Sequence, residues 1–295
     1  MRYLLTYFVS LLLALYHSSA LSYNLKIVAT IKPIHSLVAS VTDGISKPIL
    51  LGYTESVHNY ILKPSDASNL DSSNVIFYVD DNLETFVKTF ARRGKELVRL
   101  SQAANLLPVR TYSFFKNIIH IRNEKDIYVW LNPENAKNMI LYISTVLSRI
   151  DKKNSHKYNQ NAIKAINKMD QEVRKILQEL NDFRKQRYIV THDTYQYFEK
   201  YFGLNHPNAI LSMEEDAYVS IKSLIKLKKM IREENIKCIF SSSREDSIKS
   251  KLLSNNTKIV TLDPIGSSIK PGKEAYLTII NDIAQNFKSC FTESQ

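Results

Sequence analysis

The sequence predicts an α/β fold, because short apolar runs alternate with helical stretches along its 295 residues. Most of these runs are nearly continuous in apolar residues, which is typical of strands buried on both faces of a parallel sheet. The runs that indicate strands lie at residues 25–30, 75–79, 188–191, 236–240 and 258–262, with a further one at 49–52.

One segment predicts a single long helix. Residues 156–183 contain neither Gly nor Pro, and their apolar side chains recur in steps of three and four. This spacing places the apolar side chains on one helical face. A helix of ~28 residues is about 42 Å long. It is either a surface helix of one domain or a rigid spine between two α/β lobes, and its central position favours the spine.

Composition and charge place the chain among ordinary globular proteins, with 44% hydrophobic and 23% charged residues. The net charge of +11 is spread from Lys26 to Lys288 and is not clustered with aromatic residues. A nucleic-acid partner is therefore not indicated. The charge favours solubility and, beyond that, only attraction to an anionic membrane. We expect a monomer.

The N-terminus predicts a secretory signal peptide over residues 1–20. Arg2 precedes an apolar run from Leu4 to Tyr16, and small residues follow up to Ala20. The run is shorter than the roughly 20 residues that a membrane-spanning helix needs. We expect cleavage after Ala20 and a soluble mature protein outside the cytoplasmic membrane. A retained anchor is the alternative.

Export affects the interpretation of Cys238 and Cys290, the only two cysteines of the chain. An oxidising compartment permits a disulfide between them. The alternative is a metal site with two cysteine ligands, which is less favoured because no CxxC spacing accompanies them.

Three side chains able to bind a metal follow predicted strands. His58 follows the run at 49–52, His192 follows 188–191, and Asp263 follows 258–262. Ligands of open parallel sheets bind beyond the carboxyl ends of the strands. Each residue alone also has an ordinary structural explanation, and Asp263 before Pro264 is a common turn former. Jointly, the three residues indicate a metal site.

Four stretches together resemble the motifs of the metal-binding components of zinc and manganese ABC importers. They are residues 58–66 (HNYILKPSD), 126–133 (DIYVWLNP), 191–198 (THDTYQYF) and 261–266 (TLDPIG). The resemblance extends over residues 25–290, nearly the whole mature chain. It is strongest to the zinc-uptake branch, which carries His at the third motif and a C-terminal cysteine pair like Cys238 and Cys290.

The resemblance implies two Rossmann-like (β/α) lobes joined by one long helix, with the metal bound in the cleft between the lobes. It implies a signal peptide at 1–20, an N-terminal lobe at 21–150, a linking helix at 151–186 and a C-terminal lobe at 187–295. It also implies a periplasmic binding protein, not an enzyme. Such a protein captures Zn²⁺, or alternatively Mn²⁺ or Fe²⁺, and delivers it to the membrane permease and ATPase subunits of an ABC importer.

The same resemblance implies the ligands of the metal. His58 matches the first histidine ligand and His192 the third, and Asp263 matches a carboxylate that completes the site in several relatives. Residues 63–66 match the turn and helix N-cap that position the first ligand.

The sequence departs from the family pattern at the second motif, where Tyr128 stands in place of a histidine. A phenol with an ordinary pKa near 10 is a poor ligand. Val57 replaces an acidic residue, although Glu55 is close. The His-rich loop is reduced to residues 114–125, in which His120 is an alternative ligand. The predicted set is thus His58, His192 and Asp263 with Tyr128 or water, which suits zinc and also manganese or ferrous iron.

An enzyme and an adhesive surface protein are the alternatives from other functional classes. An enzyme is not indicated, because the sequence has neither a GxSxG elbow nor an HExxH pairing. An adhesive surface protein of the same fold with a degraded metal site is the remaining alternative.

Overall fold

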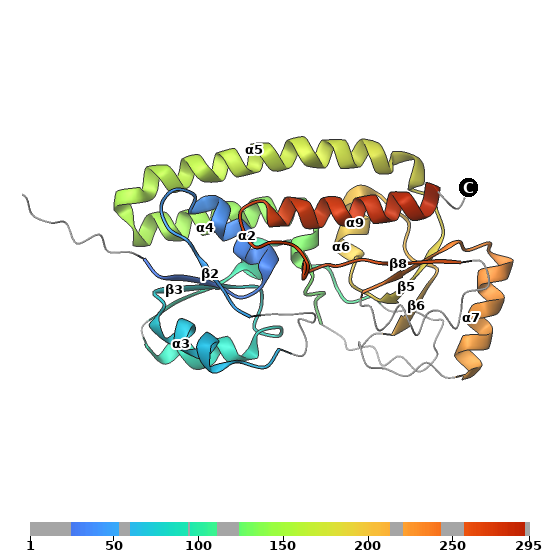
Figure 1. The fold of residues 1–295 in the computed structure, drawn as a ribbon, viewed down its shortest axis with the longest axis horizontal. Coiled ribbons are helices and arrows are strands. Elements are labelled where there is room, and N and C mark those ends of the chain that lie inside the picture. The colour runs from blue at the N-terminus through green and yellow to red at the C-terminus, as the bar shows by residue number, and fades with distance from the viewer. Residues whose placement is uncertain are drawn as a thin grey trace, which may run out of the picture.

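The computed structural model describes residues 25–52, 60–93, 95–110, 124–212, 221–242 and 257–292. Two α/β lobes lie side by side under one long helix (Figure 1). The N lobe contains strands β1 (Ile27–Ala29), β2 (Ile49–Leu50), β3 (Val75–Tyr78) and β4 (Glu96–Arg99). The C lobe contains β5 (Tyr188–His192), β6 (Ala209–Ser212), β7 (Cys238–Ser241) and β8 (Lys258–Thr261).

The two sheets are parallel and share one topology. The strand order is β2-β1-β3-β4 in the N lobe and β6-β5-β7-β8 in the C lobe. In each lobe the first strand lies between the second and the third. The chain therefore changes direction across the sheet at the first strand, which makes its carboxyl end the place where ligands bind in such sheets.

The helices connect these strands and cover the sheets. They are α2 (Lys32–Val41), α3 (Pro64–Ser72), α4 (Pro133–Ile150), α5 (Ser155–Leu180), α6 (Gln196–Phe202), α7 (Ile221–Glu233) and α9 (Ala275–Thr292). Short 3-10 helices are η1 (Thr85–Arg93), η2 (Leu100–Ala103), η3 (Val129–Leu131), η4 (Lys152–Asn154) and η5 (Asn181–Phe183).

Helix α5 confirms the predicted long helix and its role as a spine. It runs over both lobes, with α4 beside it at the N lobe and α9 beneath it toward the C lobe (Figure 1). Its buried apolar face includes Met169, Val173 and Ile176. That face belongs to one apolar core that contains residues of both sheets. Ile163, on the predicted apolar face, is instead exposed.

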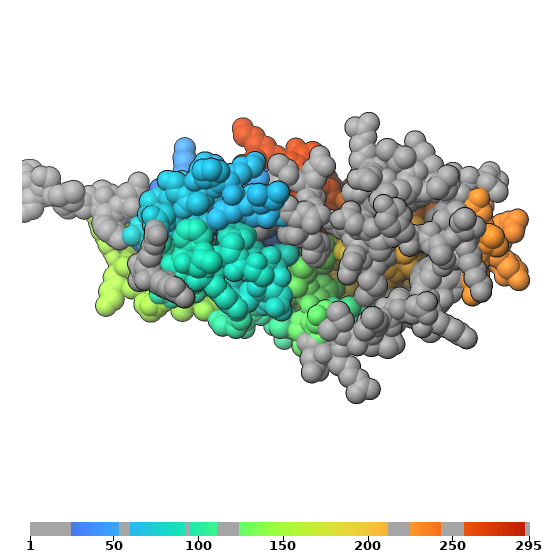
Figure 2. Space-filling view, turned by 90° about the horizontal axis from the view of Figure 1, so that it is seen from below, coloured from blue at the N-terminus to red at the C-terminus, as the bar shows by residue number. Residues whose placement is uncertain are grey.

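Each sheet is covered on its second face by a smaller apolar cluster. Val28 and Ile76 of the N lobe pack with Leu70 of α3. Ile189 and Ile239 of the C lobe pack in the same cluster as Leu227 of α7. Figure 2 shows the face opposite α5, with α3 and α7 toward its two ends. Burial on both faces explains why the strands appear in the sequence as continuous apolar runs.

Helix α3 does not begin with the polar N-cap that residues 63–66 suggest in the sequence. The helix begins at Pro64, whose fixed φ suits a first helical position, and the capping residue Lys63 makes no side-chain capping bond. Asp66 lies inside the first turn, where its Oδ2 accepts a hydrogen bond of 2.6 Å from the Tyr60 hydroxyl. The helix start is therefore set by proline geometry rather than by a polar cap.

The described residues include no helix long and apolar enough to cross a membrane. The predicted signal peptide at residues 1–20 lies outside the residues that the structure describes.

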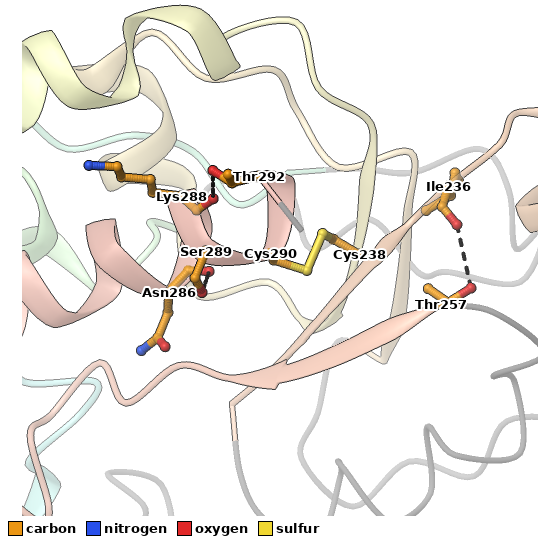
Figure 3. The surroundings of a disulfide bond; sticks show 8 residues. All are labelled: Ile236, Cys238, Thr257, Asn286, Lys288, Ser289, Cys290 and Thr292. Carbon is orange, nitrogen blue, oxygen red and sulfur yellow. Dashed lines mark hydrogen bonds between the residues drawn. A yellow bond between two sulfur atoms is a disulfide. The ribbon is translucent and has the colours of Figure 1, made fainter. Parts of the chain in front are cut away.

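Cys238 and Cys290 form a disulfide, as one of the two sequence interpretations predicts. Cys238 begins the inner strand β7, and Cys290 lies near the end of α9 (Figure 3). Both are fully buried. The bond ties the last helix to the C-lobe sheet and leaves neither sulfur available as a thiolate metal ligand.

We predict that the unreduced, denatured protein has no titratable thiols. Replacing Cys238 and Cys290 together by Ala should lower the free energy of unfolding by about 4 kcal/mol, because the bond closes a loop with a sequence separation of 52 residues. Thiol counting and denaturant unfolding of both proteins provide the test. Two titratable thiols per wild-type chain would contradict the prediction.

Candidate metal centre

Three of the predicted ligands, Tyr128, His192 and Asp263, lie within the described residues. His58 and the alternative ligand His120 lie outside them. The described part of the site therefore comprises Tyr128, His192, Asp263 and the residues that contact them.

His192 is the last residue of β5, the inner strand at which the C-lobe sheet changes direction. It is paired in register with Ser212 of β6 and shares a strand face with Tyr188 and Val190, both of which belong to the core under α5. Its side chain is 5% exposed. The fold thus places this imidazole at the sheet edge where a ligand is expected.

Tyr128 lies beside His192. Its ring centroid is 6.3 Å from that of His192 in an edge-on arrangement, and 5.2 Å from that of Trp130. The Tyr128 backbone N–H donates to Oδ1 of Asp126 at 2.9 Å. The second and third sequence motifs, 64 positions apart from Tyr128 to His192, therefore meet in space.

Asp126 links the second motif to the helix that follows His192. Its Oδ2 accepts a hydrogen bond of 3.2 Å from Gln196 Nε2, and its backbone oxygen accepts one of 3.0 Å from the Tyr197 hydroxyl. Burial raises the pKa of Asp126 to about 7, although the Tyr128 N–H opposes the rise. Because α6 begins four residues after His192, these bonds connect Tyr128 to the segment that carries His192.

The Asp263 carboxylate is held by its own turn. Oδ1 accepts from the backbone N–H of Ile265 at 3.2 Å and of Gly266 at 2.8 Å, and Oδ2 accepts from the Ser267 hydroxyl at 2.6 Å. A carboxylate has about four lone-pair sites, two on each oxygen. Two donors occupy Oδ1, so Oδ2 is the oxygen that retains a site for a cation, and Asp263 can contribute one oxygen to it.

Hydrogen bonds to main-chain oxygens join the Asp263 turn to the other two motifs. Leu262 O accepts from the Tyr195 hydroxyl at 3.0 Å, and Pro264 O accepts from Trp130 Nε1 at 2.9 Å. Tyr195 lies three residues after His192, and Trp130 two residues after Tyr128. The structure thus draws the three described motifs to one region between the lobes.

Within the described ranges, no group of three or more His, Cys, Asp or Glu side chains is arranged to hold a metal ion. The predicted set includes His58, which lies outside those ranges, and a tyrosine, which is not among these residue types. The full ligand set therefore stays a prediction.

Sequence reasoning missed Arg110. Its guanidinium donates to both oxygens of Asp193, with an Nε–Oδ2 distance of 2.9 Å, and to Oε2 of Glu199. The side chains of Arg110, Asp193 and Glu199 are only 10%, 7% and 0% exposed. Burial alone lowers the pKa of Arg110, but the two carboxylates outweigh it and raise the pKa above its ordinary value. The pairs span 83 and 89 residues, so no local pattern indicates them.

Comparison with known proteins identifies the family. The model of the family described as "Zinc-uptake complex component A periplasmic" matches residues 27–290. The chain belongs to this family. The predicted resemblance is confirmed, and so is the expectation that the chain is a binding component and not an enzyme.

Relatives agree with this assignment. The high-affinity zinc uptake system protein ZnuA of Brucella suis is 28% identical over 308 residues, covering 90% of this chain and 92% of its own. The fold matches that of a Zn(II)-bound AdcAII variant of Streptococcus pneumoniae, with a TM-score of 0.73, 20% identity and coverage of 90% and 98%. It also matches a mutant of the laminin-binding adhesin Lmb of Streptococcus agalactiae, with a TM-score of 0.74, 17% identity and coverage of 92% and 100%. The predicted two-lobed α/β fold class is confirmed.

We predict that Arg110→Met lowers the free energy of unfolding by about 3–5 kcal/mol, because it leaves two buried carboxylates without their cation. Arg149→Met is the matched control. It breaks an ion pair with Glu96 that is largely exposed, so it should cost less than about 1 kcal/mol. Chemical denaturation of the three proteins measures both effects. Equal losses of unfolding free energy in the two variants would contradict a stabilising role for the buried ion pairs of Arg110.

Proposed function

We propose that the chain captures Zn²⁺ in the periplasm and delivers it to the membrane permease and ATPase subunits of an ABC importer. Membership of the zinc-uptake family supports this function. The names of the curated relatives, which are high-affinity zinc uptake proteins, support zinc over manganese or ferrous iron. They also favour transport over the adhesive alternative.

The observation that carries the proposal is the meeting of Tyr128, His192 and the Asp263 turn between the lobes. We assign His58, His192 and Asp263 Oδ2 as ligands, with Tyr128 or water in the remaining position. Two imidazoles and a carboxylate form a ligand set typical of zinc. His58 belongs to this set because it follows β2, whose carboxyl end lies beside that of β1.

We further propose the organisation of the mature protein. Residues 1–20 are a signal peptide removed on export, residues 21–150 form the N-terminal lobe, 151–186 the linking helix, and 187–295 the C-terminal lobe. The protein acts as a monomer. The parallel sheets of the two lobes and the position of α5 between them support these boundaries.

We predict that His192→Ala removes most of the zinc-binding free energy, and that His58→Ala does the same. Wild-type protein should gain roughly 4 kcal/mol of stability at a free zinc concentration a thousandfold above its dissociation constant, and the variants should lose this gain. His206→Ala is the control, because this largely exposed histidine is not among the proposed ligands. Competition titration and thermal unfolding with and without zinc give the result. Wild-type affinity in His192→Ala would refute the ligand assignment.

We predict that Tyr128→His raises zinc affinity by roughly tenfold, which is about 1.4 kcal/mol. The variant supplies an imidazole beside His192 in place of a phenol, and imidazole is a common zinc ligand. Preference for zinc over manganese should rise as well, because nitrogen ligands favour zinc. Competition titrations with both metals measure the change. Unchanged or weaker zinc binding would mean that Tyr128 already binds as a phenolate or that another ligand, such as His120, fills the position.

A further inference from the structure

Lys32 occupies a place that is unfavourable for a lysine in two respects. It is the first residue of α2, where the positive end of the helix dipole disfavours a cation. It is also only 9% exposed, and lysine is almost never buried without a partner. Burial lowers the pKa of Lys32, with the charge of Asp263 acting in the opposite direction. A lysine that is both buried and at a helix N-terminus needs a contact that offsets these two unfavourable effects.

That contact is made across the two lobes. The Lys32 ammonium donates hydrogen bonds to the backbone oxygens of Gly266 and Ser267, the latter at 2.8 Å. Both residues belong to the turn that carries Asp263. The bonds join positions separated by 234 and 235 residues, so they connect the first helix of the N lobe to the loop after the last strand of the C lobe.

The two residues that Lys32 holds are also residues that hold the Asp263 carboxylate. Gly266 donates its N–H to Oδ1, and Ser267 donates its hydroxyl to Oδ2. Gly266 has a φ of +67°, and a Cβ at this position would lie 2.6 Å from Ile279. Only glycine fits there. In this turn the carbonyls of Gly266 and Ser267 therefore reach Lys32 while the donors of the same two residues reach Asp263.

The repeated topology places Lys32 at the carboxyl edge of the N-lobe sheet, as it places His192 at the carboxyl edge of the C-lobe sheet. Strand β1 is the inner strand at which the N-lobe sheet changes direction, as β5 is in the C lobe. His192 ends β5, and Lys32 follows β1 after two intervening residues. At the corresponding sheet edge, one lobe thus presents a proposed metal ligand and the other presents a cation that binds the turn of a second proposed ligand.

We propose that Lys32 is a positioning residue for metal binding, which holds the Asp263 turn so that the carboxylate faces the ion. This inference rests on the proposed function, because it requires Asp263 to be a ligand. Lys32 does not bind the metal itself, since an ammonium has no lone pair to donate. It acts through the main chain of Gly266 and Ser267.

Lys32→Met tests the role, because it keeps an unbranched side chain but removes both donors and the charge. Zinc binding should weaken about tenfold or more, the range found when a group that orients a metal ligand is lost. Lys273→Met is the matched control. Its ammonium pairs with Asp43 at 2.7 Å in an exposed contact away from the Asp263 turn, so zinc affinity should stay as in the wild type. Lys32→Arg retains charge and donors and should recover part of the affinity.

A double-mutant cycle with Asp263→Asn separates positioning from general destabilisation. If Lys32 acts through Asp263, Lys32→Met should cause little further loss of zinc affinity in the Asp263→Asn protein. An equal loss in both backgrounds would overturn the inference, as would wild-type affinity in Lys32→Met while Asp263→Asn binds weakly. Wild-type affinity in Asp263→Asn would instead overturn Asp263 as a ligand, and the role of Lys32 with it, while leaving the histidine ligands to their own test.

Discussion

The apolar core that continues from one lobe into the other under α5 constrains everything else in the molecule. Met169 and Val173 of the spine belong to the same core as strand residues of both sheets. Helix α9 adds to it from the C-terminus, since Tyr276 lies in this core and its hydroxyl donates to Trp130 O before α4. Separating the lobes would expose these side chains, at about 1.5–3 kcal/mol for each large apolar residue. The lobes are therefore joined on the α5 side. The polar residues of the candidate site lie at the carboxyl edges of the sheets.

At those edges the two lobes are connected by polar contacts that mostly end on main-chain oxygens. Trp130 donates to Pro264 O and Lys32 to Gly266 O across the lobes, and Tyr195 donates to Leu262 O within the C lobe. A buried carbonyl needs a donor, so each of these contacts fixes a loop and not merely a side chain. Loops fixed in this way bring Tyr128 and the Asp263 turn toward His192 before any ion arrives. A site ordered in advance loses less free energy to ordering when its ligand binds.

The sequence predicted the parts of this architecture that depend on local patterns. Strands such as β3 and β5 are buried on both faces and so consist of nearly unbroken apolar residues. The amphipathic period of α5 predicted its length to within a few residues. Strand β4 was not predicted, because Glu96 and Arg99 at its ends interrupt the apolar pattern. Strand β6 is equally short, and its Ala and Ser ends carry little strand propensity.

In the candidate site, too, local sequence patterns predict some of the residues and not others. His192 and Asp263 were predicted because each follows an apolar run, and the position after a parallel strand has a general meaning. Arg110 and Lys32 were not, because an isolated basic residue in a chain with 40 Lys and Arg has no distinguishing local pattern. Their partners lie 83 to 235 residues away. Only the folded arrangement shows that these two cations are buried.

The burial of these two cations also gives the candidate site its electrostatic character. Arg110 neutralises part of the charge of Asp193, directly beside His192, and Lys32 lies close enough to Asp263 for its charge to act on that carboxylate. A divalent ion is attracted most strongly by uncompensated carboxylates, and such attraction discriminates little between metals. Where nearby carboxylates are already compensated, the ion depends more on the lone pairs of its direct ligands. Ligand type then weighs more in the choice of metal, and imidazole nitrogen favours zinc over manganese. In the proposed site, the cations that hold the loops therefore leave more of the choice of metal to the type of ligand.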